Sequence, residues 1–81
     1  MSVQTFTAYV EQDPESGLYV GVVPGLPGVH TQAATLDELR QNLEEVILLV
    51  LEARAARGEP MDVPPFVGIQ QIEVPQNKVP R

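Results

Sequence analysis

Residues 35–58 carry the start and stop signals of one long helix, and this segment limits what an 81-residue chain can fold into. Thr35 and Glu38 have the spacing of a capping box, and two acidic residues lie in the first turn. Two arginines lie in the last turn, just before Gly58, the residue type that most often ends a helix in the left-handed conformation. The pattern therefore predicts a helix from Leu36 to about Arg57.

The residues before this helix have the composition of strands and tight turns. Apolar and polar residues alternate over 3–12, the pattern of a half-buried strand, and turn-forming residues follow at 13–17. Residues 18–23 provide a second strand, so a hairpin is expected. We call a register even-sum when the numbers of two paired residues add to an even number. An even-sum register places three residues of each strand on one face, Leu18, Val20 and Val22 beside Phe6, Ala8 and Val10. It also places Tyr9 and Tyr19 together on the other face.

The remaining segments complete a βββαβ order. Pro24–Gly28 holds two prolines and two glycines and predicts a loop, and Val29–Ala33 predicts a short third strand. After the helix, Phe66–Val74 predicts a fourth strand. We therefore expect an α+β fold with an antiparallel-rich sheet and one long helix packed on one face. We expect residues 1–74 to form a single domain and residues 75–81 a tail.

The helix predicts both a core and an interface. Its apolar stripe and the first hairpin give the expected core, Phe6, Val20, Val22, Leu39, Leu43, Ile47 and Val50. Leu48 and Leu51 fall outside this stripe and Leu49 borders its opposite edge, which predicts an interface with a second subunit in a dimer or tetramer. The alternative is a wider core covered by the linker 59–65.

Composition excludes several classes of protein. There is no cysteine and only one histidine, so neither a disulfide framework nor a cysteine or histidine zinc site is expected. A formal charge of −6 repels nucleic acid and anionic lipid, which leaves a basic protein as a possible partner. No signal peptide or membrane-length apolar run is evident, so we expect a cytoplasmic protein that binds neither membrane nor nucleic acid directly.

No residue pattern predicts catalysis, a metal or a cofactor. His30 has no serine, cysteine or threonine at a spacing that suggests a nucleophile. Glu11, Asp13 and Glu15 alternate like calcium ligands, but glycine and the closing glutamate are not where such a loop needs them. Only Glu11 and Glu73 lie near strand ends, too few for a two-metal nuclease. We therefore expect a protein that is not an enzyme.

The same acidic turn is a candidate docking site. All charges before Arg40 are negative, and Glu11, Asp13 and Glu15 concentrate at one end of the expected sheet, near Tyr9 and Tyr19. A basic partner would be attracted there. The alternative is a solvated turn that only keeps the protein soluble.

Residues 17–39, with the sequence GLYVGVVPGLPGVHTQAATLDEL, resemble the HicB-like antitoxin family. The shared pattern is a glycine-led strand, a Leu-Pro-Gly loop, a short strand and a threonine-capped helix. The resemblance implies a truncated RNase H-like βββαβ fold without nuclease carboxylates. It also implies a protein that binds and neutralises a small basic HicA-type toxin, which cleaves messenger RNA. Many members continue into a DNA-binding segment, whereas only Pro75–Arg81 follows here, so operator binding is not expected.

The leading hypothesis is thus a non-enzymatic, homo-oligomeric antitoxin that covers the toxin's catalytic site. The alternative is a stand-alone oligomer that regulates another protein or binds a small ligand without any toxin. A metal-dependent nuclease is a third, weaker hypothesis.

Overall fold

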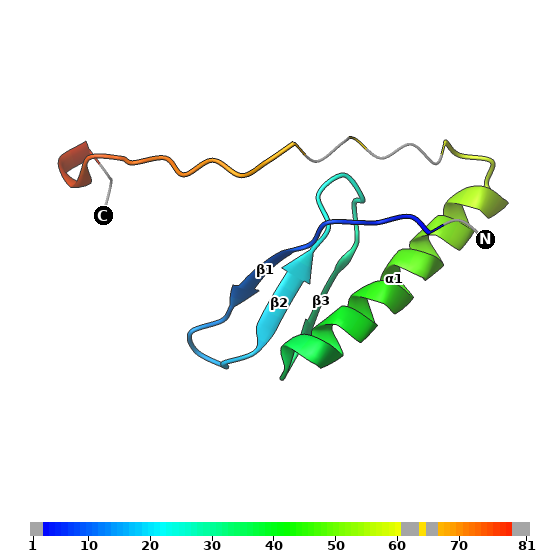
Figure 1. Ribbon diagram of the computed structural model, residues 1–81, viewed down its shortest axis with the longest axis horizontal. Helices are drawn as coiled ribbons and strands as arrows, with labels where there is room; N and C mark the ends of the chain where they lie inside the picture. The colour runs from blue at the N-terminus through cyan, green and yellow to red at the C-terminus, as the bar shows by residue number, and fades with distance from the viewer. Residues whose placement is uncertain (1–2, 61–63, 65–66, 79–81) are drawn as a thin grey trace.

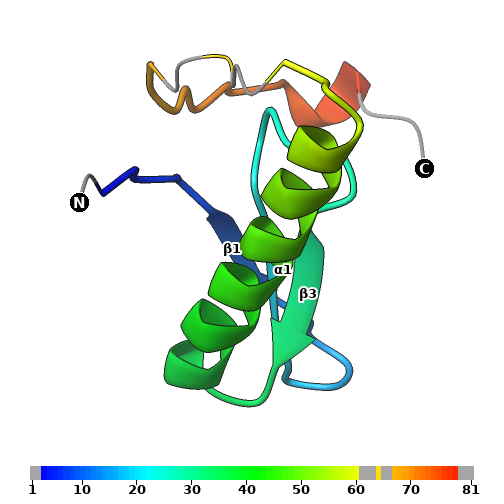
Figure 2. The same ribbon diagram turned by 90° about the vertical axis from the view of Figure 1, so that its right-hand side faces the viewer.

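The computed structural model describes residues 3–60, 64 and 67–78 of the chain. Three short strands, β1 (Tyr9–Gln12), β2 (Tyr19–Val22) and β3 (His30–Ala33), form one antiparallel sheet in the order β1-β2-β3. One long helix, α1 (Leu36–Ala56), crosses one face of this sheet (Figures 1 and 2). A single 3₁₀ turn, η1 (Gln76–Lys78), lies near the C-terminus. The expected α+β architecture is confirmed, with three strands.

The β1–β2 turn forms as the sequence predicted, and Asp13 organises it. The Asp13 carboxylate accepts hydrogen bonds from the Glu15 backbone N–H at 3.1 Å and from the Ser16 hydroxyl at 2.9 Å. The Asp13 carbonyl accepts from the Gly17 N–H at 2.8 Å, and Gly17 takes a φ of 76° that other residues adopt only with strain. The turn is thus held by its own residues.

Both ends of α1 also match the prediction. The Thr35 hydroxyl accepts from the Glu38 backbone N–H at 3.1 Å, which caps the N-terminus. At the C-terminus, Gly58 has a φ of 69°, and the Glu59 N–H donates to the Arg54 carbonyl at 2.9 Å. This pair of features is a Schellman ending.

The predicted even-sum register of the hairpin is wrong. Tyr9 pairs with Val22 and Val10 with Gly21, an odd-sum register. Gly21 therefore lies on the helix side, where a Cβ atom would be 3.0 Å from Leu43 Cδ1, and the neighbouring Val20 and Val22 point away from the helix. The expectation that Val20 and Val22 form the core is consequently incorrect. The absence of a side chain at residue 21 lets the helix approach β2.

The core instead extends into the loop between β2 and β3. The buried residues come from β2's end, this loop, β3 and the helix: Val23, Leu26, Val29, Ala33, Leu39 and Leu43. The loop folds inward because Val23, Leu26 and Val29 hydrogen-bond to one another through their backbones at 3.1–3.2 Å. Of the predicted core, Leu39 and Leu43 are buried; the others that pack against the cluster are half-buried: Phe6, Ile47 and Val50.

Two strand predictions fail. β1 begins at Tyr9 rather than near residue 3, and residues 3–8 approach the sheet without joining it. Residues 67–74 form no strand, while Phe66 lies outside the described residues. A strand requires a neighbour to hydrogen-bond with, and the described residues of this chain supply none there. The order observed in the described residues is therefore βββα.

Candidate functional site

One face of the sheet is left open by the helix. Because side chains alternate along a strand, the residues that pair with Val20 and Val22 lie on the face opposite α1. Two cross-strand rows result, Tyr9–Val22–His30 and Glu11–Val20–Gln32. We call these six residues the open face.

The open face combines aromatic, aliphatic and acidic groups. The Tyr9 side chain is 49% exposed and that of Val22 is 37% exposed. A hollow of about 180 Å³ lies between Tyr9, Glu11, Val20 and Val22. A hydrogen bond with the Glu11 carboxylate, together with its negative charge, raises the pKa of Tyr9. The surface therefore offers hydrocarbon for contact beside a carboxylate.

The structure separates the two tyrosines that the sequence placed together. Tyr19 pairs with Gln12 and Ala33, lies on the helix side and packs against the core. The predicted joint Tyr9 and Tyr19 face is wrong, because the observed register is odd-sum and not even-sum. Only Tyr9 belongs to the open face.

The three acids of the predicted docking site have different surroundings. Glu11 lies on the open face, whereas Glu15 is exposed in the turn. Hydrogen bonds from the Glu15 backbone and the Ser16 hydroxyl lower the pKa of Asp13. Asp13 therefore holds the turn, whereas the carboxylates of Glu11 and Glu15 take no part in its hydrogen bonds.

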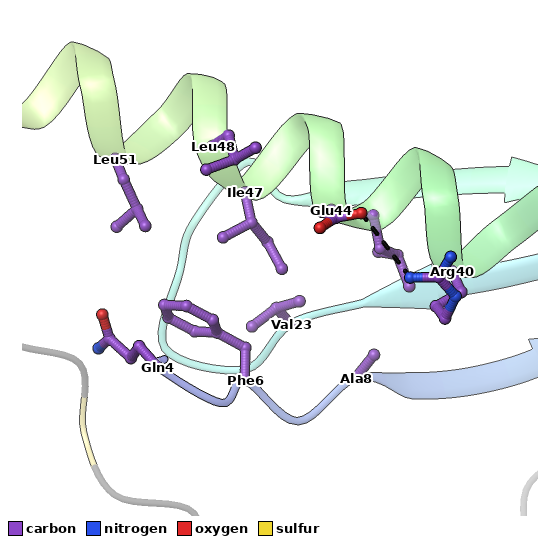
Figure 3. A pocket seen from close by; sticks show the side chains of 10 residues that line it. Gln4, Phe6, Ala8, Val23, Arg40, Glu44, Ile47, Leu48 and Leu51 are labelled. Atoms are coloured by element: carbon purple, nitrogen blue, oxygen red, sulfur yellow. Dashed lines mark ion pairs between the residues drawn. The ribbon is translucent and has the colours of Figure 1, made fainter. Parts of the chain in front are cut away.

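A second surface is a groove of about 420 Å³ between α1 and the segment that leads into β1 (Figure 3). Its lining includes Phe6 and Ala8 on one side and Ile47, Leu48 and Leu51 of the helix on the other. Arg40 and Glu44 form an ion pair of 3.7 Å at one end. We call this surface the apolar groove.

The apolar groove contains two of the three leucines that the sequence assigned to an interface. Leu48 is 53% exposed and lines it with Leu51, whereas Leu49 is 64% exposed and is not among its lining residues. The sequence did not predict the contribution of Gln4, Phe6 and Ala8. The alternation at residues 4, 6 and 8 was the available signal, and it was assigned to a longer strand.

Metal-ligating side chains do not gather on either surface as far as the structure describes them. Across residues 3–60, 64 and 67–78, no three His, Cys, Asp or Glu side chains cluster closely enough to hold a metal ion. His30 is exposed and faces Val22 across the strand pair. Within the same residues, no helix is both long and apolar enough to cross a membrane.

Comparison with known proteins identifies the family. A family model described as UPF0150-like matches residues 7–61, which include all three strands and α1. The chain belongs to the UPF0150-like family. A UPF0150 protein of Thermotoga maritima is 49% identical over 69 residues, covering 85% of this chain and 88% of the relative.

Two further relatives extend the family across distant organisms. A UPF0150 protein of Archaeoglobus fulgidus is 45% identical over 71 residues, covering 85% of this chain and 93% of the relative. One from Synechocystis is 42% identical over 74 residues, covering 91% of this chain and all of the relative. No solved structure matches the chain. These UPF0150 names mention no antitoxin, so the resemblance to HicB-like antitoxins stays a prediction.

Proposed function

We propose that this UPF0150-like protein is a non-enzymatic protein-binding domain of the antitoxin type, which binds a small basic protein through its open face. The observation that carries the proposal is the composition of that face, where Tyr9 and Val22 are exposed beside the Glu11 carboxylate. Exposed aromatic and aliphatic groups with a charged rim are typical of protein interfaces.

The charge distribution supports a basic partner. No lysine or arginine precedes Arg40, so every charged residue of the sheet and its turns is acidic. The arginines that are described lie on or just after α1, across the sheet from the open face. A cationic protein is therefore attracted toward the β1–β2 hairpin, and this attraction raises the association rate at low salt.

The proposed mechanism is occlusion. The resemblance to HicB-like antitoxins supports a HicA-type toxin that cleaves messenger RNA as the partner, and a truncated RNase H-like fold for the binding domain. The acidic hairpin steers the toxin, and contact with Tyr9 and Val22 holds it so that RNA cannot reach its catalytic site. The protein itself needs no catalytic group for this role.

The test uses a short basic protein encoded beside this gene. We expect the purified protein to bind it and to suppress its cleavage of RNA. Changing Glu11→Lys and Glu15→Lys together should slow association and flatten its dependence on salt, because the steering charges are reversed. The matched control is Glu45→Lys with Glu52→Lys, which changes the net charge equally on exposed positions of α1.

Two results would contradict the proposal. If both double variants slow association equally, the association rate depends on the net charge of the protein, and the hairpin is not the docking site. If no neighbouring basic protein binds the parent, the alternative of a stand-alone oligomer, with a regulated protein or a small ligand as its partner, replaces the antitoxin hypothesis.

A further inference from the structure

Residues 67–74 form an extended apolar segment that packs on nothing described in the chain. We call it the C-terminal arm. Its apolar side chains are strongly exposed, with Val67 at 95% and Ile69 at 73%. The arm runs past the end of the sheet toward η1, which contacts neither the sheet nor α1 (Figures 1 and 2). Within the described residues, its backbone makes no hydrogen bond to the rest of the protein.

The shape of the molecule shows how far this segment departs from a compact chain. The radius of gyration is 15.9 Å, and the longest dimension is 51 Å against 27 and 22 Å for the others. A compact domain of this length has a radius of gyration of about 12 Å. An extended segment with exposed β-branched residues gains stability only when another surface covers it.

The sequence of the arm suits a strand. Val67 and Ile69 share one side of an extended chain, and Ile72 and Val74 share the other. Such a segment has apolar groups for both faces of a sheet. Prolines at 60, 64 and 65 separate it from α1, and proline favours an extended chain over a tight return.

The surface that fits such a strand lies at the edge formed by β1. β1 pairs with β2 on one side, and no other described strand pairs with its second side. The backbone of α1 lies over β3 and β2 and not over β1. Val10, on the helix side of β1, is therefore 42% exposed, and the apolar groove opens beside it.

We propose that the C-terminal arm of a second copy of this chain adds to the β1 edge as a fourth strand. Its backbone pairs with the free side of Tyr9–Gln12. One of its two apolar pairs enters the apolar groove against Phe6, Ile47 and Leu51, and the other lies next to Tyr9 on the open face. The exchange is reciprocal, so each subunit gives one arm and receives one, which closes a two-fold dimer.

This arrangement pairs two surfaces that have no partner among the described residues of a single chain. One chain contains both an extended apolar segment that pairs with no described strand and a β1 edge that no described strand covers, and the helix residues beside that edge are apolar. The proposal does not depend on a toxin, because the arm and the β1 edge both belong to this chain.

The first test is the mass of the intact protein by light scattering. We expect the mass of two chains for the parent. Leu48→Lys, which places a charge in the groove, should shift the mass toward one chain. Leu49→Lys is the matched control, since the neighbouring leucine is at least as exposed but does not line the groove. A parent of one chain, or equal effects of both changes, would overturn the proposal.

The arm is tested by an equivalent pair of variants. Ile69→Lys with Ile72→Lys should give the mass of one chain, whereas Gln76→Lys with Asn77→Lys, which adds the same charge beyond the arm, should not. A dimer that survives the first pair of changes would show that the arm is not part of the interface.

The second test establishes which chain receives the arm. Because the protein has no cysteine, Gln70→Cys accepts a single nitroxide label. Labelled chains are unfolded and refolded with ¹⁵N-enriched chains that carry no nitroxide, so that mixed dimers form. We expect the amide signals of Tyr9–Gln12 to broaden in these mixed dimers and to stay sharp with a label at Glu45→Cys. If broadening appears only when the nitroxide and ¹⁵N are on the same chain, the arm folds onto its own sheet and the proposal is wrong.

Discussion

A methyl group added to Gly21 of β2 would lie 3.0 Å from Leu43 Cδ1 in α1, closer than carbon atoms pack in a core. It would also lie 3.4 Å from both δ carbons of Leu39. Leu39 and Leu43 are the two helix residues that are buried. The helix therefore rests on the sheet at the one position of β2 that has no side chain, and this contact determines which face of the hairpin becomes the core.

Enlarging residue 21 should destabilise the protein. We expect Gly21→Val to lower the free energy of unfolding by about 1 to 3 kcal/mol, because its methyl groups overlap the two leucines. Urea unfolding followed by circular dichroism measures the change. In combination with Leu43→Ala the loss should be smaller than the sum of the two single losses. Additive losses would show that residue 21 and Leu43 are not in contact.

The register makes a separate prediction about Leu39 and Val22. Leu39 is 1% exposed, so Leu39→Ala should lower the free energy of unfolding by about 2 to 5 kcal/mol. Val22 points away from the helix, and Val22→Ala should cost no more than about 1 kcal/mol. Urea unfolding of both variants decides between the two registers. A large loss at Val22 would support the even-sum register and contradict the structure.

Features that depend on neighbouring residues were predictable from the sequence. The cap at Thr35, the glycine that ends α1 and the turn at Asp13 each involve contacts within about five residues, and all three appear at the predicted positions. Their chemistry is local, so a single segment contains the information that determines them.

Features that depend on contacts between distant residues could not be predicted from the sequence. The alternating valines of β2 led to the prediction that they face the helix. In the structure, Gly21 between them is the residue of β2 against which Leu39 and Leu43 of α1 pack. Leu26 and Val29 belong to a proline and glycine loop, yet they are buried because the loop folds back under the helix. Strand propensity over 67–74 did not produce a strand, since pairing needs an edge that the described part of the chain does not bring to it.

The cap of α1 can be tested through Thr35. Thr35→Ala removes the hydroxyl that accepts from the Glu38 N–H, and we expect it to lower the free energy of unfolding by about 1 kcal/mol. Thr35→Ser keeps the acceptor and should stay close to the parent. Thermal unfolding by circular dichroism compares them. An equal loss in both variants would mean that the threonine methyl group, and not the cap, is responsible.

Asp13 predicts how the hairpin responds to acid. Its pKa is lowered in the fold by hydrogen bonds from the Glu15 backbone and from Ser16, so the carboxylate stabilises the folded state above the unfolded pKa. That stabilisation is lost as the pH falls through the folded pKa. NMR titration of the Asp13 carboxyl carbon should give a midpoint below the ordinary 3.8, and Ser16→Ala should move it upward. A midpoint unaffected by Ser16→Ala would remove the hydroxyl from this explanation.

Tyr9 and Glu11 provide a chemical probe of the open face. Hydrogen bonding to the Glu11 carboxylate and the negative charge of that group oppose ionisation of the Tyr9 hydroxyl, so the pKa of Tyr9 lies above the ordinary 10.0. In a Tyr19→Phe background Tyr9 is the single tyrosine, and its ionisation is followed by ultraviolet absorbance. We expect Glu11→Gln to lower the midpoint and Glu45→Gln, on α1, to leave it unchanged.

The same titration reports on occupation of the open face. A lysine or arginine of a bound partner beside Glu11 neutralises the carboxylate and favours the tyrosinate, so the midpoint should fall when a basic protein binds there. Binding elsewhere leaves Tyr9 and Glu11 as they are in the free protein. A partner that binds the Tyr19→Phe protein tightly without moving the Tyr9 midpoint is therefore not placing a cation beside Glu11, and steering by this carboxylate would have to be given up.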